Sequence, residues 1–176
     1  MSAPPTHHPL VQLARAAIET YVRDRRKLKP AEAPAPIEGG SAGVFVTIHT
    51  ASTGDLRGCI GTINPTEDVL AQEVINNAIA AATRDPRFPP VRPAELNDLE
   101  LDVSVLYPPE PIDSPEQLDV KQYGVIVERE YRRGLLLPDI PGIDDVATQV
   151  SYARMKAGIG PKEPVELFRF RVEKYL

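Results

Sequence analysis

The sequence lacks several features that particular classes of protein require. Cys59 is its one cysteine among 176 residues, so no intrachain disulfide can form, which fits a reducing compartment. Basic residues number 20 against 25 acidic ones, and the net charge of −5 is poorly suited to binding nucleic-acid or lipid phosphates. No apolar run approaches the roughly 20 residues of a membrane-spanning helix, and the first nine residues lack the pattern of a signal peptide. We therefore expect a cytoplasmic protein that binds neither nucleic acid nor membrane.

The motifs of common cofactor-dependent enzymes are also missing. The sequence has no Gly-rich phosphate loop ending in lysine and no dinucleotide fingerprint after a first strand. It has no Gly-x-Ser-x-Gly motif either. One cysteine and three scattered histidines do not make the ligand set of a structural zinc site. We expect no cofactor and no metal.

The residues that are present suffice for one folded domain. Apolar residues make up 42% of the chain, and 176 residues fit one domain, with at most a small second lobe. We predict a single domain over residues 1–176, in which residues 1–8 are mobile. The Pro/Ala/Gly-rich segment 29–43 is expected to form a surface loop, and whether it covers a site stays open.

Hydrophobic periodicity predicts helices and strands, and the strands come mostly as hairpins. Thr66 is expected to cap the second helix and Gly158 to end the third. The expected helices span residues 9–27, 67–83 and 144–157, with strands over 44–50, 56–63, 99–107, 124–128, 133–137 and 167–175 and a helical turn near residue 115. Because the strands do not alternate with helices, we predict an α+β fold with a mainly antiparallel sheet flanked by helices.

A run of basic residues closes the first predicted helix. It comprises Arg23, Arg25, Arg26, Lys27 and Lys29. We interpret this run as a solvated helix C-terminus, where cations complement the helix dipole.

The segment Arg57-Gly58-Cys59-Ile60-Gly61 is the strongest candidate for chemistry. Glycine weakens a strand, so Gly58 and Gly61 need a reason such as a bulge or the close approach of a ligand. In a regular strand Arg57 would share a face with Cys59 and favour the thiolate, which is the nucleophilic form. The alternative is an inert cysteine in a core strand, with glycines that make room for a helix packed above it.

A nucleophile needs a base, and the sequence offers no clear one. His7 and His8 lie in the terminus expected to be mobile. His49 lies in the first arm of the predicted hairpin, either near Cys59 across the ladder or displaced toward the turn. We interpret His49 as a solvated residue at a strand end.

A second polar cluster lies in the proline-rich loop Asp85-Pro86-Arg87-Phe88-Pro89-Pro90. Asp85 and Arg87 either stabilise this rigid loop as an ion pair or place charge at the mouth of a pocket beside Cys59. Tyr107, Tyr123, Glu128 and Lys156 are further candidates for pocket residues, with no specific pattern in their favour.

Five segments of the sequence resemble the AMMECR-type domain family. In family order they are Leu56-Arg57-Gly58-Cys59-Ile60-Gly61, Asp85-Pro86-Arg87-Phe88, Val103-Ser104-Val105-Leu106, Gly134-Leu135-Leu136-Leu137-Pro138 and Lys156-Ala157-Gly158. Residues 61–66 and 138–144 are similar to the bacterial branch called AmmeMemoRadiSam system protein A. The resemblance spans about residues 10–175. It implies an α+β fold with a larger and a smaller lobe and a cleft lined by residues 57–61.

The resemblance implies partners rather than a settled reaction. These partners are a Memo-type dioxygenase-like protein and a radical S-adenosylmethionine protein, associated genetically if not physically. Many relatives carry a cysteine where Arg154 stands, so a mechanism with two thiols is not expected. Relatives often have glycine in place of Glu130, so the turn there is expected to differ.

Two hypotheses about function follow. In the first, the protein is an enzyme or enzyme subunit in which Cys59 is the nucleophile and Arg57 stabilises the thiolate or a bound carboxylate. The binding residues for its small-molecule or peptide ligand would then be Gly58, Gly61, Asp85 and Arg87. In the second, the protein is a non-catalytic binding or adaptor module in the same pathway, and a wholly structural role is a third alternative.

Overall fold

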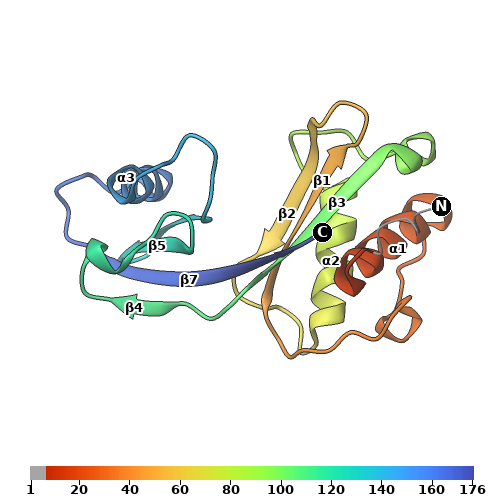
Figure 1. Ribbon diagram of the computed structural model, residues 1–176, viewed down its shortest axis with the longest axis horizontal. Helices are drawn as coiled ribbons and strands as arrows, with labels where there is room; N and C mark the ends of the chain where they lie inside the picture. Colours follow the sequence, from red (N-terminus) through yellow and green to blue (C-terminus); the bar gives the residue numbers. More distant parts are fainter. Residues whose placement is uncertain (1–6) are drawn as a thin grey trace, which may run out of the picture. The chain divides into compact units, whose positions relative to one another are not determined.

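The computed structural model describes residues 7–176, which form two compact units (Figure 1). The first and larger unit runs up to Val105 and includes the last four residues, Glu173–Leu176; the second unit comprises Leu106–Val172. Of the segment expected to be mobile, residues 1–6 lie outside the described residues. His8 is well anchored: its Nδ1 accepts a hydrogen bond from the Leu10 amide, and its ring stacks on Tyr175 at 4.0 Å.

The first unit packs helices against one face of an antiparallel sheet. Its helices are α1 (Pro9–Asp24) and α2 (Leu70–Thr83), with short 3-10 turns at Pro30–Glu32 and Pro93–Asp98. Its strands are β1 (Gly43–Thr50), β2 (Leu56–Thr62) and β3 (Leu99–Leu106), in the order β2-β1-β3, followed by the end of β7 (Glu166–Tyr175). Helix α2 packs on β1 and β2, and α1 packs on α2 (Figure 1). The core therefore fills the space between this helical layer and the inward face of the sheet.

The hairpin of β1 and β2 contains a β-bulge. Thr47 pairs with Cys59 and Ile48 with Gly58, but His49 pairs with Leu56. Arg57 is therefore the extra residue of the bulge, and the strict alternation of side chains along β2 is broken at this point.

The second unit is a smaller antiparallel sheet covered by one helix. Its elements are β4 (Glu110–Ile112), a 3-10 turn at Pro115–Gln117, β5 (Tyr123–Arg129), β6 (Arg132–Leu136), α3 (Val146–Ala157) and most of β7. β4 and β5 both pair with β7, and β6 pairs with β5. Helix α3 packs on β5 and β6 over a core that includes Val125, Val127 and Leu136.

The predicted α+β class with a mainly antiparallel sheet is confirmed, while several element ends differ. Helix α2 begins at Leu70 rather than at residue 67, and Thr66 does not cap it. The buried carboxylate of Glu73 instead accepts hydrogen bonds from the amides of Thr66 (3.0 Å) and Glu67 (2.9 Å). Strand β4 was not predicted, because three residues that include a proline carry almost no periodic signal.

Other local predictions agree with the structure. Helix α3 ends at Gly158, which adopts the left-handed conformation of a C-cap. The loop over residues 29–43 is mostly extended, apart from its 3-10 turn and an isolated bridge from Gly40 to Val69. No helix in residues 7–176 has the length and apolar character needed to cross a membrane.

Candidate functional site

The site lies on the face of the first unit's sheet that points away from α2. Val44, Val46 and Ile48 of β1 are fully buried in the core beneath the helices, whereas the alternating residues Thr47 and His49 are only half-buried on the opposite face. We call the second face, with Thr47, His49, Cys59, Asp102 and Lys174, the polar sheet face. It gathers one thiol, one hydroxyl and three ionisable side chains from four strands.

Cys59 is half-buried and its sulfur has a hydroxyl partner. The Sγ atom lies 3.4 Å from the Oγ1 atom of Thr47, which is directly across the ladder. Strand pairing positions both side chains, because residues opposite each other in an antiparallel ladder point to the same face. The thiol is therefore held against a group that can accept its proton.

The backbone of Cys59 is clamped by the Asp85–Arg87 ion pair. The Cys59 amide donates to Oδ2 of Asp85 (2.9 Å), and Nη2 of Arg87 donates to the Cys59 carbonyl (3.4 Å). Asp85 is buried, with 4% of its surface exposed, and Arg87 contacts both of its oxygens at 3.0 and 2.8 Å. Because β2 is at the edge of the sheet, this pair occupies hydrogen-bonding positions that a further strand would use.

Asp85 and Arg87 also shift each other's pKa values. The Arg87 guanidinium holds the pKa of the Asp85 carboxyl well below its usual range, although burial acts in the opposite direction. Asp85 in turn raises the pKa of Arg87, and the nearby Cys59 contributes in the same direction. The Arg87 side chain is 55% exposed, so its cation can also meet a ligand from solution.

Arg57 does not occupy the position that a regular strand would give it. The bulge directs it to Glu95, with Nε–Oε1 and Nη2–Oε2 distances of 2.9 and 3.2 Å. The pair is largely buried on the arginine side, and Arg57 lowers the pKa of Glu95. Arg87 donates a hydrogen bond to the carbonyl of Cys59 and is affected by its charge, whereas Arg57 forms an ion pair with Glu95.

The two glycines that flank Cys59 are explained by packing. A Cβ atom on Gly58 would lie 2.2 Å from the backbone oxygen of Ala81 in α2. A Cβ atom on Gly61 would lie 2.3 Å from the ring of Phe45. Protein atoms fill both spaces, as the helix-packing interpretation anticipates at Gly58.

Asp102 is a residue of the site that the sequence analysis did not single out. It lies on β3 with 6% of its surface exposed, and its Oδ2 is 3.8 Å from Nζ of Lys174. Burial raises the pKa of its carboxyl, an effect opposed by Lys174, His49 and the hydroxyl of Thr47. The available signal was an acidic residue that alternates with the apolar residues Leu101, Val103 and Val105 of the strand, but only the fold brings it to Thr47.

The other predicted candidates make contacts elsewhere. His49 pairs with Leu56, beyond the bulge, so it is not opposite Cys59. Tyr123, Glu128 and Lys156 belong to the second unit, with Tyr107. There they make local contacts: the ring of Tyr123 faces Arg169, Glu128 pairs with Arg133, and Lys156 donates to the Leu135 carbonyl.

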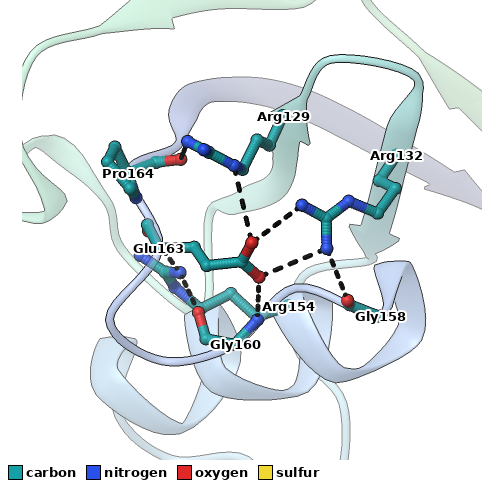
Figure 2. A network of polar contacts seen from close by, with 7 residues as sticks. All are labelled: Arg129, Arg132, Arg154, Gly158, Gly160, Glu163 and Pro164. Atoms are coloured by element: carbon teal, nitrogen blue, oxygen red, sulfur yellow. Dashed lines mark hydrogen bonds and ion pairs between the residues drawn. The ribbon is translucent and has the colours of Figure 1, made fainter.

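Arg154, the position at which the family resemblance suggested a cysteine, belongs to a polar network of the second unit (Figure 2). Its Nη1 donates to the carbonyls of Gly160 (2.7 Å) and Glu163 (2.9 Å). Arg132 and Arg129 approach the Glu163 carboxylate at 2.9 and 3.5 Å, and Arg132 is the main cause that lowers the pKa of Glu163 to about 2. The network ties the loop after α3 to the β5–β6 hairpin and holds no thiol.

Residues 7–176 contain no cluster of three or more His, Cys, Asp or Glu side chains arranged to hold a metal ion.

Comparison with known proteins finds similar proteins that match nearly the whole chain. The AMMECR1 family model matches residues 11–175. A protein from Thermotoga maritima is 52% identical over 170 residues, covering 96% of this chain and 97% of its own length. A protein from Thermococcus gammatolerans is 42% identical over 179 residues, covering 93% and 86%. The crystal structure of uncharacterized protein PH0010 from Pyrococcus horikoshii is similar with a TM-score of 0.81 and 37% identity, covering 94% of this chain and 88% of that one.

Proposed function

The chain belongs to the AMMECR1 family, and from that premise we propose that it is an enzyme or enzyme subunit whose chemistry centres on the thiol of Cys59. The observation that carries the proposal is the fixed position of this residue. Its amide and carbonyl are bound by the Asp85–Arg87 pair, while its sulfur lies 3.4 Å from a hydroxyl on a half-buried surface. A structural cysteine in a core would need none of these polar neighbours.

Cys59 acts as the nucleophile in this proposal, and Thr47 passes its proton to Asp102. The thiol proton moves to Oγ1 of Thr47 as the hydroxyl proton of Thr47 moves to the Asp102 carboxylate. The thiolate then adds to a carbonyl carbon of the substrate, the π electrons of the C=O bond move to the carbonyl oxygen, and this oxygen takes up the proton held by Asp102. The raised pKa of Asp102 supports its role, because a base is most effective when its pKa approaches the working pH.

Arg87 takes the role of cation that the sequence analysis assigned to Arg57. Its guanidinium is exposed and contacts the backbone carbonyl of Cys59, and it would bind a carboxylate or a similar anionic group of a small-molecule or peptide substrate. Arg57 and Glu95 then serve to fix the bulge. Gly58 and Gly61 support the site by allowing β2 to pack against α2 and Phe45.

The first experiment is the alkylation of the full chain by iodoacetamide between pH 5 and pH 9, followed by mass spectrometry. The lone cysteine makes the readout unambiguous. We expect the folded protein to be labelled without prior unfolding, because the thiol is half-buried and lies on a polar surface. Labelling that requires unfolding would show a buried, inert cysteine and would overturn the proposal.

Substitutions of Thr47 and Asp102 test the proposed transfer of the Cys59 proton through Thr47 to Asp102. Asp102→Asn and Thr47→Val should each slow alkylation at pH 7 by about tenfold or more, because the thiol loses its route to a base. Glu38→Gln is the matched control, since Glu38 is an exposed carboxylate of the same unit that does not act on the pKa of Asp102. Equal rates in all three variants would remove Thr47 and Asp102 from the mechanism.

One observation favours a second function, that of a non-catalytic binding or adaptor module. The hydrogen-bond partner of the Cys59 sulfur is a threonine hydroxyl rather than a histidine or a carboxylate. In this proposal the protein works in the cytoplasm in an AmmeMemoRadiSam system, with a Memo-type protein and a radical S-adenosylmethionine protein as partners. Co-purification of such partners with Cys59→Ser protein, together with full biological activity of that variant, would support the adaptor and exclude the nucleophile.

A further inference from the structure

The first unit has a concave surface away from the polar sheet face, lined by residues at the C-terminal ends of α1 and α2. This pocket has a volume of about 380 Å³. Arg25, Lys27 and Arg84 contribute three cations to its lining, and none of its lining residues is acidic. The volume is within the range of small-molecule sites, and we call this surface the basic pocket.

The cations of the basic pocket are unpaired, which distinguishes them from most arginines of this acidic chain. Arg26 pairs with Glu32 at 2.8 Å and Arg57 with Glu95 at 2.9 Å, as examples. By contrast, no side-chain hydrogen bond or ion pair of Arg25, Lys27 or Arg84 occurs within the described part of the chain. Three like charges that converge on one concavity repel each other, and a bound anion would relieve this repulsion.

The helix dipole explains only part of this arrangement. Helix C-termini favour cations, which was the interpretation of the basic run that ends the first helix. That argument applies to each helix separately and does not require Arg25 and Arg84, from different helices, to meet at one pocket. Arg25 also has a φ of 55°, in the left-handed region that favours glycine, and its guanidinium lies 5.8 Å from the centre of the Tyr21 ring.

We propose that the basic pocket binds a small organic phosphate. Arginine guanidinium groups match the geometry of phosphate oxygens and bind them in pairs, and lysine adds a point charge. The Tyr21 ring and Ile79 supply an apolar wall for the organic part of the ligand. The three cations favour a doubly or triply charged anion over a single carboxylate.

The polar neighbours of the pocket add little to recognition. The hydroxyl of Thr83 already donates to the Ile79 carbonyl at 2.7 Å. Asn76 accepts from Gln72 at 3.0 Å and donates to Glu67 at 2.8 Å. Recognition therefore depends on charge, which makes substitutions of the cations the decisive test.

The test is isothermal titration of the full chain with phenyl phosphate and with inorganic phosphate at low and moderate salt. We expect saturable binding at one site, weakened by salt because phosphate contacts displace counterions. The double variant Arg25→Gln/Arg84→Gln should weaken binding at least tenfold, and Lys27→Gln should weaken it less. Tighter binding of phenyl phosphate than of inorganic phosphate would assign the site to an organic phosphate rather than to the free ion.

The control carries the same change of charge outside the pocket. Arg23→Gln/Lys162→Gln removes two exposed cations, one at the end of α1 and one in the second unit, and should leave affinity unchanged. Equal weakening in both double variants would show non-specific attraction and overturn the proposal. Absence of saturable binding by the wild-type chain, or binding of an acidic peptide without any binding of the phosphates, would overturn it as well.

Discussion

Two buried aspartates lie on either side of Cys59 and are tuned in opposite directions. Asp85 is neutralised by Arg87 and the Cys59 amide, so the pKa of its carboxyl falls. At Asp102 burial outweighs the opposing effects of Lys174, His49 and the hydroxyl of Thr47, so the pKa of its carboxyl rises. At the residue scale, the same chemical group therefore serves as a structural clamp at one position and as a candidate base at the other.

Asp102→Asn should stabilise the protein at neutral pH, although it slows the alkylation of Cys59. The folded state binds the Asp102 proton more tightly than the unfolded chain, so the contribution of this group is favourable below the unfolded pKa of about 3.9 and is lost as pH rises through the folded value. Asparagine at this position does not ionise, so the variant does not lose this stability as pH rises. Urea denaturation at pH 7 should show a higher midpoint for the variant, and a lower one would mean that the carboxylate stabilises the fold.

Glu130→Gly should stabilise the β5–β6 turn. Glu130 has a φ of 55°, a conformation that costs a residue with a side chain about 1 kcal/mol. We expect a gain of about 0.5–1 kcal/mol in the free energy of unfolding, measured by guanidinium denaturation. Tyr131→Gly is the control in the same turn: Tyr131 is 89% exposed and has no positive φ, so glycine there should give no gain.

At the element scale, the position of β2 depends on its close approach to α2. The Ala81 carbonyl occupies the space where a side chain of residue 58 would begin. This approach seats one face of the hairpin on the helix, while the Asp85–Arg87 pair holds its outer edge. The polar sheet face is thus fixed from two directions before any ligand binds.

Gly58→Ala should destabilise the first unit. The added Cβ atom would lie 2.2 Å from a backbone oxygen, which can move only if the strand or the helix shifts. Overpacking of this kind costs about 1–3 kcal/mol. Gly40→Ala is the matched control, because no atom lies within 4 Å of its added Cβ. Equal denaturation midpoints for both variants would contradict the close packing of β2 on α2.

At the scale of the whole molecule, the carboxyl groups whose pKa is lowered by an arginine outnumber the one whose pKa is raised by burial. Arginine neighbours lower the pKa values of Asp85, Glu95 and Glu163, whereas burial raises that of Asp102. These pairs occur in both units, each of which has its own hydrophobic core. Because more of these pKa values are lowered than raised, the folded protein is more stable when its carboxyl groups are ionised.

Stability should therefore fall in acid. A carboxyl whose folded pKa is lowered contributes stability above its unfolded pKa of about 4, and this contribution is lost as pH falls through the folded value. For Glu163 the folded value is about 2. Urea midpoints measured from pH 7 to pH 2.5 should stay nearly constant to about pH 5 and then decrease. A midpoint that rises below pH 4 would contradict the dominance of the arginine pairs.

Much of the architecture was predictable because its signals are local. The alternation of Leu101, Val103 and Val105 predicts a strand, and the position of Gly158 predicts the end of a helix, without knowledge of the rest of the chain. The family resemblance also depends on short contiguous motifs. Cys59, Asp85 and Arg87 could therefore be selected from the sequence, together with the α+β class.

The grouping of the site could not be predicted, because it depends on pairings between distant segments. The bulge at Arg57 arises from the register of β1 against β2, and it sends that arginine to Glu95. Asp102 reaches Thr47 because β3 lies beside β1 in the strand order. The sequence alone thus determined the types of most elements, their order and the candidate segment around Cys59, since periodicity and turn residues act over a few positions. Tertiary structure alone decided which charged side chain contacts Cys59, since hydrogen-bond register and burial depend on residues far apart in the chain.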